Sequence, residues 1–202
     1  MVQTPIKAII NSLEIPDTVL LQVTLEQFTQ LAAINRDMRL ERTAEGELIV
    51  NPPAGSQSGM YNSELNLELA YWNRSTGYLG FVFDSSAGFT LPNGAVRAPD
   101  ASWISRERWE SLTPKEKKGF APLCPDFVIE LRSETDKLST LQAKMQEYIK
   151  NGARLGWLID PQSKQVEIYR IAQEVEILEN PGELLGEDVL LGFTLNLKRV
   201  FD

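Results

Sequence analysis

The stretch DFVIELRSETD, residues 126–136, predicts the central strand of the fold. From Phe127 to Leu131 every residue except Glu130 is apolar, which is typical of a strand buried on both faces. A carboxylate that is buried alone costs several kcal/mol, so such a group is normally paired, protonated or bound to a metal ion. Glu130 is therefore the first candidate for a functional residue.

Further elements are expected on both sides of this strand. Helices are predicted over residues 23–35 with a capping box at Thr24 and Gln27, over 62–77, and over 136–152 with Gly152 as the stop. Strands are predicted as a hairpin over 38–53 with its turn at Glu45 and Gly46, then over 78–86, 96–105, 154–161 and 165–171, with short ones near Glu176 and Phe193. A flexible loop is expected over 54–59, and helical turns within 106–120. This order predicts a mixed α/β or α+β domain around one central sheet.

Two absences narrow the chemistry. The chain contains no histidine and a single cysteine, Cys124. Histidine-based triads, Cys–His pairs, disulfides and zinc sites built from these residues are thereby excluded, and Cys124 is expected to be a small buried hydrophobe. No glycine-rich nucleotide-binding motif is present. Catalysis is left to carboxylates, Lys, Arg, Tyr and a hard metal ion.

Charge and hydropathy indicate an ordinary globular protein. The net charge of −8 counts mildly against non-specific binding of nucleic acid, although acids clustered around a metal ion would give the same sum. No apolar run is long enough to span a bilayer, and residues 1–17 lack the apolar core of a signal peptide. A cytoplasmic location without a membrane partner is expected.

Two acids interrupt otherwise apolar or small surfaces. Strand alternation places Glu130 on the face of Val128, and it places Asp100 on a face with Ser102 in the strand predicted over 96–105. Each predicted strand thus carries one acid near its middle, and the two acids meet if the strands are neighbours. A pair of carboxylates with an open coordination position suits Mg²⁺.

The helix predicted over residues 136–152 adds a cation. Lys144 borders its apolar stripe, next to Met145, so the helix can return Lys144 to the side of Glu130. The structural alternative for Lys144 is a stem laid over the edge of the core. For Glu130 the alternative is a structural pair with a cation such as Arg132.

Three segments resemble a known family. The stretches VRAPDASWIS, CPDFVIELRS and KMQEYIKNGARLGWLIDP are similar to the restriction-endonuclease-like family called Uma, within the PD-(D/E)XK nuclease superfamily. The resemblance covers nearly the whole chain and implies a restriction-endonuclease-like fold, a central mixed β-sheet flanked by helices. It implies a single domain over residues 1–202. Its parts would be an N-terminal helix and hairpin extension over about 1–50, a nuclease core over 51–171 and C-terminal strands over 172–202.

By position, the resemblance also implies a site. Asp100 and Glu130 would hold Mg²⁺ or Mn²⁺, with Glu64 in YNSELN as a further metal ligand. The superfamily's lysine position, two residues beyond the second acid, holds Arg132, which cannot act as a base at neutral pH. Lys144 on the following helix matches the lysine role.

The implied reaction is metal-assisted hydrolysis of phosphodiester bonds in DNA. The metal ion would polarise a phosphoryl oxygen and acidify a bound water, while Lys144 orients that water or stabilises charge in the transition state. Cutting both strands is most easily done by two copies related by a two-fold axis, so a homodimer is expected. Asp126 is expected at the mouth of its strand and Asp160 in a turn, while Tyr148 is expected to pack in the core.

Two other functions stay open at this point. A glycoside hydrolase also uses two carboxylates but needs neither metal nor lysine. A catalytically inactive domain that keeps the nuclease fold and binds DNA or protein would accommodate Arg132. Candidate DNA contacts, for which a solvated loop is the alternative, are Arg106, Arg108, Lys115, Lys117 and Lys118.

Overall fold

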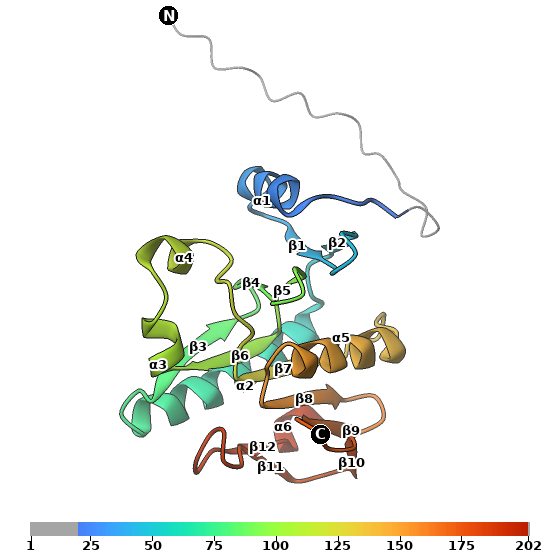
Figure 1. Ribbon diagram of the computed structural model, residues 1–202. Coiled ribbons are helices and arrows are strands. Elements are labelled where there is room, and N and C mark those ends of the chain that lie inside the picture. Colours follow the sequence, from blue (N-terminus) through green and yellow to red (C-terminus); the bar gives the residue numbers. More distant parts are fainter. Residues whose placement is uncertain (1–19, 202) are drawn as a thin grey trace, which may run out of the picture.

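The computed structural model describes residues 20–201 and is built around a six-stranded sheet. The strands lie in the order β10-β9-β8-β7-β6-β3 (Figure 1). Their bounds are β3 (Gly80–Asp84), β6 (Ala101–Ser105), β7 (Phe127–Leu131), β8 (Leu155–Asp160), β9 (Gln165–Arg170) and β10 (Glu176–Glu179). β7 and β8 are parallel, and the other neighbouring pairs are antiparallel. The predicted mixed sheet is confirmed, with the strand around Glu130 near its centre.

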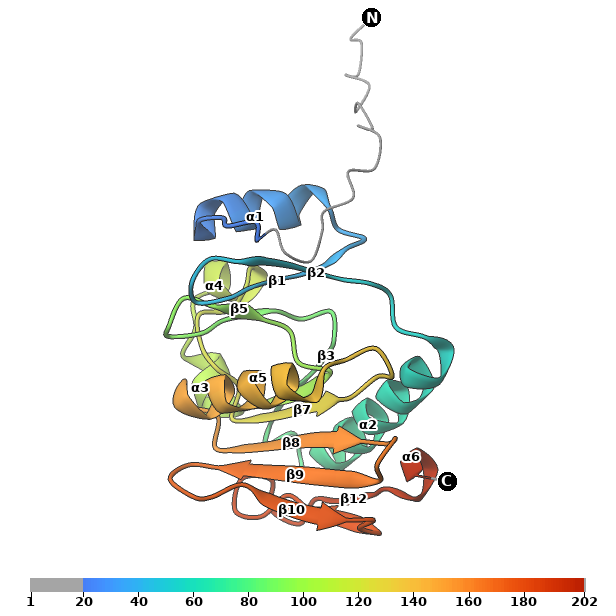
Figure 2. The same cartoon turned by 90° about the vertical axis from the view of Figure 1, so that its right-hand side faces the viewer.

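Helices cover both faces of this sheet. The helices of the described chain are α1 (Leu25–Ile34), α2 (Ser56–Ser75), α3 (Arg106–Glu110), α4 (Pro114–Lys118), α5 (Leu138–Lys150) and α6 (Lys198–Phe201), of which α2 and α5 pack on opposite faces of the large sheet. Leu65 and Leu69 of α2 share one buried cluster with Ile129, whereas Met145 of α5 belongs to the opposite cluster with Val128. Figure 2 shows α5 lying over β7. The predicted alternation of β7 is therefore confirmed, and Glu130 lies on the side of α5.

A smaller sheet forms the N-terminal part of the described chain. Its strands, in the order β2-β1-β5-β4, are β1 (Arg39–Arg42), β2 (Leu48–Asn51), β4 (Phe89–Thr90) and β5 (Val96–Arg97). Thr24 and Gln27 form the predicted capping box of α1. In the β1–β2 turn Gly46 adopts φ +96°, a left-handed conformation that favours glycine. In Figure 2 these strands lie between α1 and the layer that contains α5 and β7.

Residues 96–105 are not one strand, contrary to the expectation from alternation. β5 ends at Arg97 in the small sheet, and β6 begins at Ala101 in the large one. Pro99 lies in the break; it has no N–H to donate to a ladder and so favours an interruption. Asp100 therefore lies where the chain passes between the sheets, and not in the middle of a strand.

Helix α2 starts earlier than the sequence predicts. Residues 54–59 are expected to form a flexible loop, but the helix begins at Ser56 with Gly55 as its N-cap. The buried side chains Leu65, Leu69 and Trp72 anchor the helix, and packing of this kind overrides the low helix propensity of its first turn. The predicted stop of α5 is confirmed: Gly152 follows the end of the helix and adopts φ +108°.

The C-terminal part completes the fold. β10 extends the large sheet as expected near Glu176, while β11 (Glu183–Leu185) and β12 (Thr194–Asn196) form a separate antiparallel pair. Within residues 20–201, no helix is both long and apolar enough to cross a membrane. Residues 1–17, in which no signal peptide is expected, lie outside the described residues. The same holds for the predicted N-terminal extension up to residue 19.

Candidate functional site

Glu130 lies deep in the protein, on a strand whose five residues are all buried. Only 4% of its surface is exposed. The Lys144 Nζ atom is 2.8 Å from Glu130 Oε1, and the Tyr148 hydroxyl donates a hydrogen bond of 3.0 Å to the same oxygen. The expected return of Lys144 to Glu130 is therefore confirmed. Tyr148 packs in the core as expected and also contacts the acid.

Arg132 is not the partner of Glu130. Its Nη1 atom lies 2.7 Å from Asp160 Oδ2, and its Nε donates to the carbonyl of Asp136. Asp160 also accepts hydrogen bonds from the Gln162 N–H and the Ser163 hydroxyl, as expected for a turn residue. An ion pair with Arg132 is therefore excluded as a structural explanation for Glu130. The cation at this acid is Lys144.

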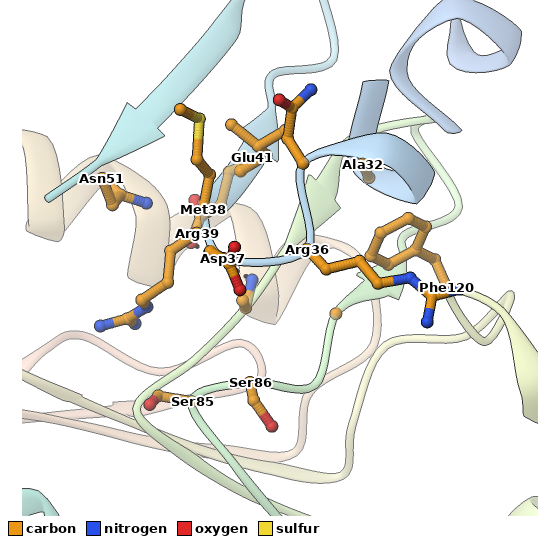
Figure 3. A pocket seen from close by; sticks show the side chains of 14 residues that line it. Ala32, Arg36, Asp37, Met38, Arg39, Glu41, Asn51, Ser85, Ser86 and Phe120 are labelled. Atoms are coloured by element: carbon orange, nitrogen blue, oxygen red, sulfur yellow. Dashed lines mark hydrogen bonds between the residues drawn. The ribbon is translucent and has the colours of Figure 1, made fainter. Parts of the chain in front are cut away.

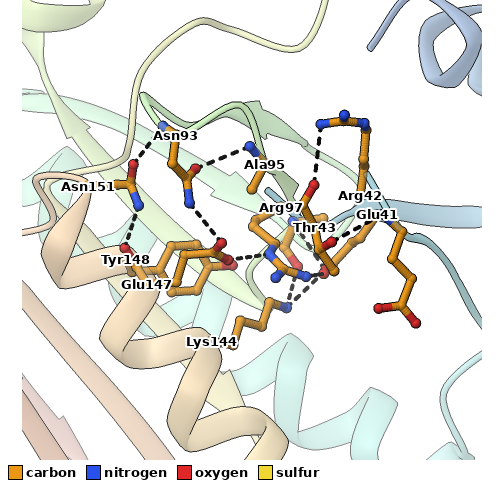
Figure 4. A network of polar contacts seen from close by, with 12 residues as sticks. Glu41, Arg42, Thr43, Asn93, Ala95, Arg97, Lys144, Glu147, Tyr148 and Asn151 are labelled. Carbon is orange, nitrogen blue, oxygen red and sulfur yellow. Dashed lines mark hydrogen bonds and ion pairs between the residues drawn. The ribbon is translucent and has the colours of Figure 1, made fainter. Parts of the chain in front are cut away.

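Glu41, on β1, is a third acid beside Lys144 that sequence reasoning missed. Lys144 donates a hydrogen bond of 2.9 Å to Glu41 Oε1, while Arg97 lies 3.2 Å from Glu41 Oε2 and 2.6 Å from Glu147 (Figure 4). Only 3% of Glu41 is exposed. In β1, with the sequence RLER, alternation places Glu41 on the face opposite Leu40, so the pattern does not mark Glu41 as buried.

The charges in this network shift each other's pKa. Burial raises the pKa of the Glu130 carboxyl to about 7; Lys144 opposes this rise, and the negative charges of Asp100 and Glu41 add to it. Although burial disfavours its ammonium, Glu130 and Glu41 raise the pKa of Lys144 above its ordinary value. Lys144 therefore stays protonated at neutral pH, and a further cation near Glu130 would favour the ionised carboxylate.

Asp100 lies beside the same end of β7. Its Oδ2 accepts a hydrogen bond of 2.9 Å from the Leu131 N–H. Its Oδ1 lies 3.4 Å from Arg39 Nη2 and accepts a hydrogen bond of 3.3 Å from the Asn62 amide. The backbone carbonyl of Asp100 accepts from the Asn66 amide at 3.0 Å. Asp100 thus lies between the N-terminal half of α2 and the end of β7, near enough to influence the pKa of Glu130.

Two side chains of α2 that contact Asp100 carry amide oxygens without hydrogen-bond partners. The amide oxygens of Asn62 and Asn66 are buried and have no hydrogen-bond partner, although both amide nitrogens point to acceptors at or near Asp100. Buried polar groups without a partner are uncommon and call for an explanation. Amide and carboxylate oxygens are the hard donors that Mg²⁺ and Mn²⁺ prefer, although the atoms of Asn62 and Asn66 that contact Asp100 are the amide nitrogens.

Glu64 does not join these donors. Its carboxylate forms an ion pair of 3.0 Å with Arg199 of α6. Across residues 20–201, no group of three or more His, Cys, Asp or Glu side chains is arranged to hold a metal ion. The predicted set of three carboxylates is therefore not assembled, and Asn62 and Asn66 are the α2 side chains that contact Asp100.

The predicted DNA contacts begin at the other end of the central strands. β6 separates Asp100 from Arg106, and a strand of five residues spans about 17 Å. Arg106 pairs with Glu110 at 3.1 Å, and Arg108 pairs with Asp126 at 2.8 Å. Asp126 also accepts from the Ser105 N–H. These contacts hold α3 to the start of β7, on the side away from Glu130.

A cavity of about 280 Å³ borders the site (Figure 3). Its lining includes Glu41 and Ala98, which both accept hydrogen bonds from Lys144, and Arg39, the ion-pair partner of Asp100. Ser85 and Ser86 lie on the opposite wall from Arg39. A ligand in this cavity would therefore contact Arg39, which pairs with Asp100, and Glu41, which shares Lys144 with Glu130.

Comparisons with known proteins agree with this fold. A family model described as "Uma2: Putative restriction endonuclease" matches residues 25–198. Among solved structures, the chain is similar to "a putative nuclease belonging to DUF820 from Anabaena variabilis ATCC 29413", with 23% identity and a TM-score of 0.74, covering 89% of this chain and 97% of that one. A search among curated proteins found no match. The match over most of the chain shows that this protein belongs to the Uma2 family of restriction-endonuclease-like proteins.

Proposed function

We propose that this member of the Uma2 family is a metal-dependent endodeoxyribonuclease that hydrolyses phosphodiester bonds in DNA. The observations that support the proposal are the contact of Lys144 Nζ with Glu130 at 2.8 Å and the hydrogen bond that the Asp100 carboxylate accepts from the N–H of Leu131, the residue after Glu130. The chain belongs to a family described as putative restriction endonucleases, and this membership supports phosphodiester hydrolysis as the reaction class. Burying acids and a cation together costs free energy of desolvation, and a catalytic role would explain why the arrangement is kept.

Asp100 and Glu130 would hold the metal ion, Mg²⁺ or Mn²⁺, next to Asn62 and Asn66, whose amide nitrogens contact Asp100. A bound divalent ion supplies Lewis acidity toward a phosphoryl oxygen and lowers the pKa of a bound water. Glu64, which pairs with Arg199, keeps only the role that the family resemblance implies for it. The protein's own contribution is to hold the two carboxylates on one strand end and to keep bulk water away from Glu130.

Lys144 acts as a fixed positive charge. Its raised pKa keeps the ammonium protonated, so Lys144 is suited to stabilise negative charge on phosphate oxygens and unsuited to accept a proton. Glu41 and Arg97 are positioning residues that hold this ammonium between two carboxylates. Arg39, ion-paired with Asp100, is the half-exposed cation at the mouth of the site.

A second candidate is a catalytically inactive nuclease-fold domain that binds DNA or protein. The observation in its favour is that no three acidic or other metal-ligating side chains converge within the described part of the chain. An inactive domain would retain Lys144 as a structural counterion to Glu41 and Glu130. A nicking assay separates the two candidates.

The test uses supercoiled plasmid DNA with Mg²⁺, Mn²⁺ or EDTA. The proposal predicts nicking with either metal, none with EDTA, and none with Asp100→Asn or Glu130→Gln under any condition. Nicking that survives EDTA, or that Asp100→Asn leaves unchanged, would contradict the site. Folded protein without nicking in any divalent ion would support the inactive domain.

A homodimer and a cytoplasmic location complete the proposal. The dimer is expected because two copies related by a two-fold axis place one site on each DNA strand. Light scattering at tens of micromolar checks it, and a monomer both with and without DNA would contradict it.

A further inference from the structure

A second cavity, of about 630 Å³, lies between α1, α4 and the turn after β3. Its walls carry the aromatic side chains Phe83, Trp109 and Phe120. The rings of Phe83 and Trp109 lie 4.9 Å apart, and Phe120 packs 5.3 Å from Phe28 of α1. These contacts hold an aromatic lining that stays half-buried instead of closing into the core.

The rim of this cavity is positively charged. Arg36, Lys117 and Lys118 line it, and no Asp or Glu is among its described lining residues. Lys117 Nζ lies 5.8 Å above the Trp109 ring, while Arg36 and Lys118 are exposed. In a chain with a net charge of −8, a hollow whose charged groups are all cations is suited to an anionic ligand with an aromatic or apolar body.

This cavity continues into the one that borders the acids. The residues that line both are Ala32, Arg36, Ser86, Gly88 and Phe120. Figure 3 shows Arg36 extending toward Phe120 on one side of the first cavity, with Arg39 on the other. The joined cavities therefore lead from the aromatic side chains past Arg36 to Arg39, the ion-pair partner of Asp100, with Asp37 and Glu41 also in the lining of the first cavity.

We propose that the aromatic cavity binds an unpaired nucleotide of a nucleic-acid strand. The base would lie among Phe83, Trp109 and Phe120, and its phosphates would contact Arg36, Lys117 and Lys118. Single-stranded nucleic acid is bound by this combination of aromatic surfaces and a cationic track, and a base held in a duplex cannot enter such a hollow. The inference rests on the proposed function, since it names the strand form that the cavity path would lead to Asp100 and Glu130.

The decisive measurement is binding of a fluorescein-labelled single-stranded oligonucleotide, followed by anisotropy in EDTA with Glu130→Gln protein. Arg36→Gln and the double variant Lys117→Gln, Lys118→Gln should each weaken binding at least about 5-fold. The slope of log Kd against log salt should fall by about 0.7 for each cation removed. Lys115→Gln is the matched control: Lys115 is exposed on the same helix but does not line the cavity, so it should change Kd by less than about 2-fold.

The aromatic part is tested on the ligand, which leaves the protein core intact. An oligonucleotide of the same length with abasic sites should bind at least about 5-fold more weakly, the lower end of base–aromatic stacking. A duplex of the same sequence should bind more weakly than the single strand. Equal binding of the abasic strand, preference for the duplex, or equal losses with Lys115→Gln would overturn the proposal. Because binding is measured without metal and with an inactive variant, a failure of the nuclease proposal would not affect these outcomes.

Discussion

Two buried glutamates, Glu130 and Glu167, lie beneath α5, and the groups that donate hydrogen bonds to them differ in charge. In the sheet register both Glu130 and Glu167 pair with Leu158, one from each side, so the three residues form a row beneath α5. Glu130 is held by Lys144 and the Tyr148 hydroxyl. Glu167 is held by the Gln142 amide at 2.7 Å and by the Tyr169 hydroxyl.

The difference is one of charge. The donors to Glu167 are an amide and a phenol, and they satisfy the carboxylate without adding a cation. Glu130 instead shares a cation with Glu41 and lies close to Asp100, so negative charge accumulates at its end of the row. Neutral donors fit a structural role for Glu167, whereas Glu130 lies among charged groups, with Lys144 and Arg97 at Glu41 and Arg39 at Asp100, and this is the end of the row at which we propose the metal ion.

The largest expected effect is on DNA cleavage. Glu130→Gln should reduce Mg²⁺-dependent nicking by at least about 1000-fold, because it removes a metal ligand whose ion contributes several kcal/mol to transition-state stabilisation. Glu167→Gln is the matched control and should retain nicking within about 5-fold of wild type. Equal loss of cleavage in the two variants, with both proteins folded, would contradict the distinction between Glu130 and Glu167.

Stability should follow the same contrast. Lys144→Met leaves Glu41 and Glu130 without their shared cation and should lower the free energy of unfolding by about 3–5 kcal/mol in EDTA at neutral pH. Gln142→Leu removes one neutral donor from Glu167 and should cost about 1–3 kcal/mol. Urea unfolding followed by tryptophan fluorescence measures both, and equal costs would mean that charge does not distinguish the two glutamates.

The raised pKa of Glu130 gives a pH dependence. A carboxyl whose pKa is higher in the folded than in the unfolded chain contributes its full stability below the unfolded pKa, and loses it as the pH rises through the folded value of about 7. Metal-free wild type should therefore lose stability relative to Glu130→Gln between about pH 5 and about pH 8. The loss should be at most about 3–4 kcal/mol, since the pKa rises from 4.5 to about 7 and a tenfold change in proton affinity corresponds to about 1.4 kcal/mol. Thermal unfolding of both proteins checks this, and a pH-independent difference would show that Glu130 is ionised throughout.

The smallest effect sharpens the choice of residues on α2. Asn62→Ala removes an amide that contacts Asp100 and should reduce cleavage about 10–100-fold. Glu64→Ala, which frees Arg199, should change cleavage by less than about 10-fold. Initial nicking rates at saturating Mg²⁺ measure both. A loss with Glu64→Ala as large as with Glu130→Gln would restore Glu64 as a metal ligand, as the family resemblance implies.

Local patterns in the sequence predicted most of the large sheet. The apolar run around Glu130, the stripe on α5 and the stop at Gly152 are strong signals, and each corresponds to an observed element. The break at Pro99 and the early start of α2 were not predicted, because tertiary packing and the division into two sheets decide them. Alternation alone cannot tell which sheet a short strand joins.

Only part of the site was predicted, because local sequence patterns do not report contacts between distant segments. The contact between Lys144 and Glu130 followed from helix periodicity after a buried strand. Glu41 comes from a distant hairpin, on the strand face opposite the apolar Leu40, and on α2 it is Asn62 and not Glu64 that contacts Asp100. Such long-range contacts leave no local signal in one sequence.

The central claim is that Asp100 and Glu130 share one divalent metal ion. Crystals of the full chain soaked in Mn²⁺ test it most directly, because Mn²⁺ scatters anomalously and stands in for Mg²⁺ at oxygen sites. The account predicts one anomalous peak bonded to carboxylate oxygens of both Asp100 and Glu130, which disappears in Glu130→Gln crystals and persists in Glu167→Gln crystals. A peak at Glu167, or none at these two acids when Mn²⁺ is saturating, would contradict the account.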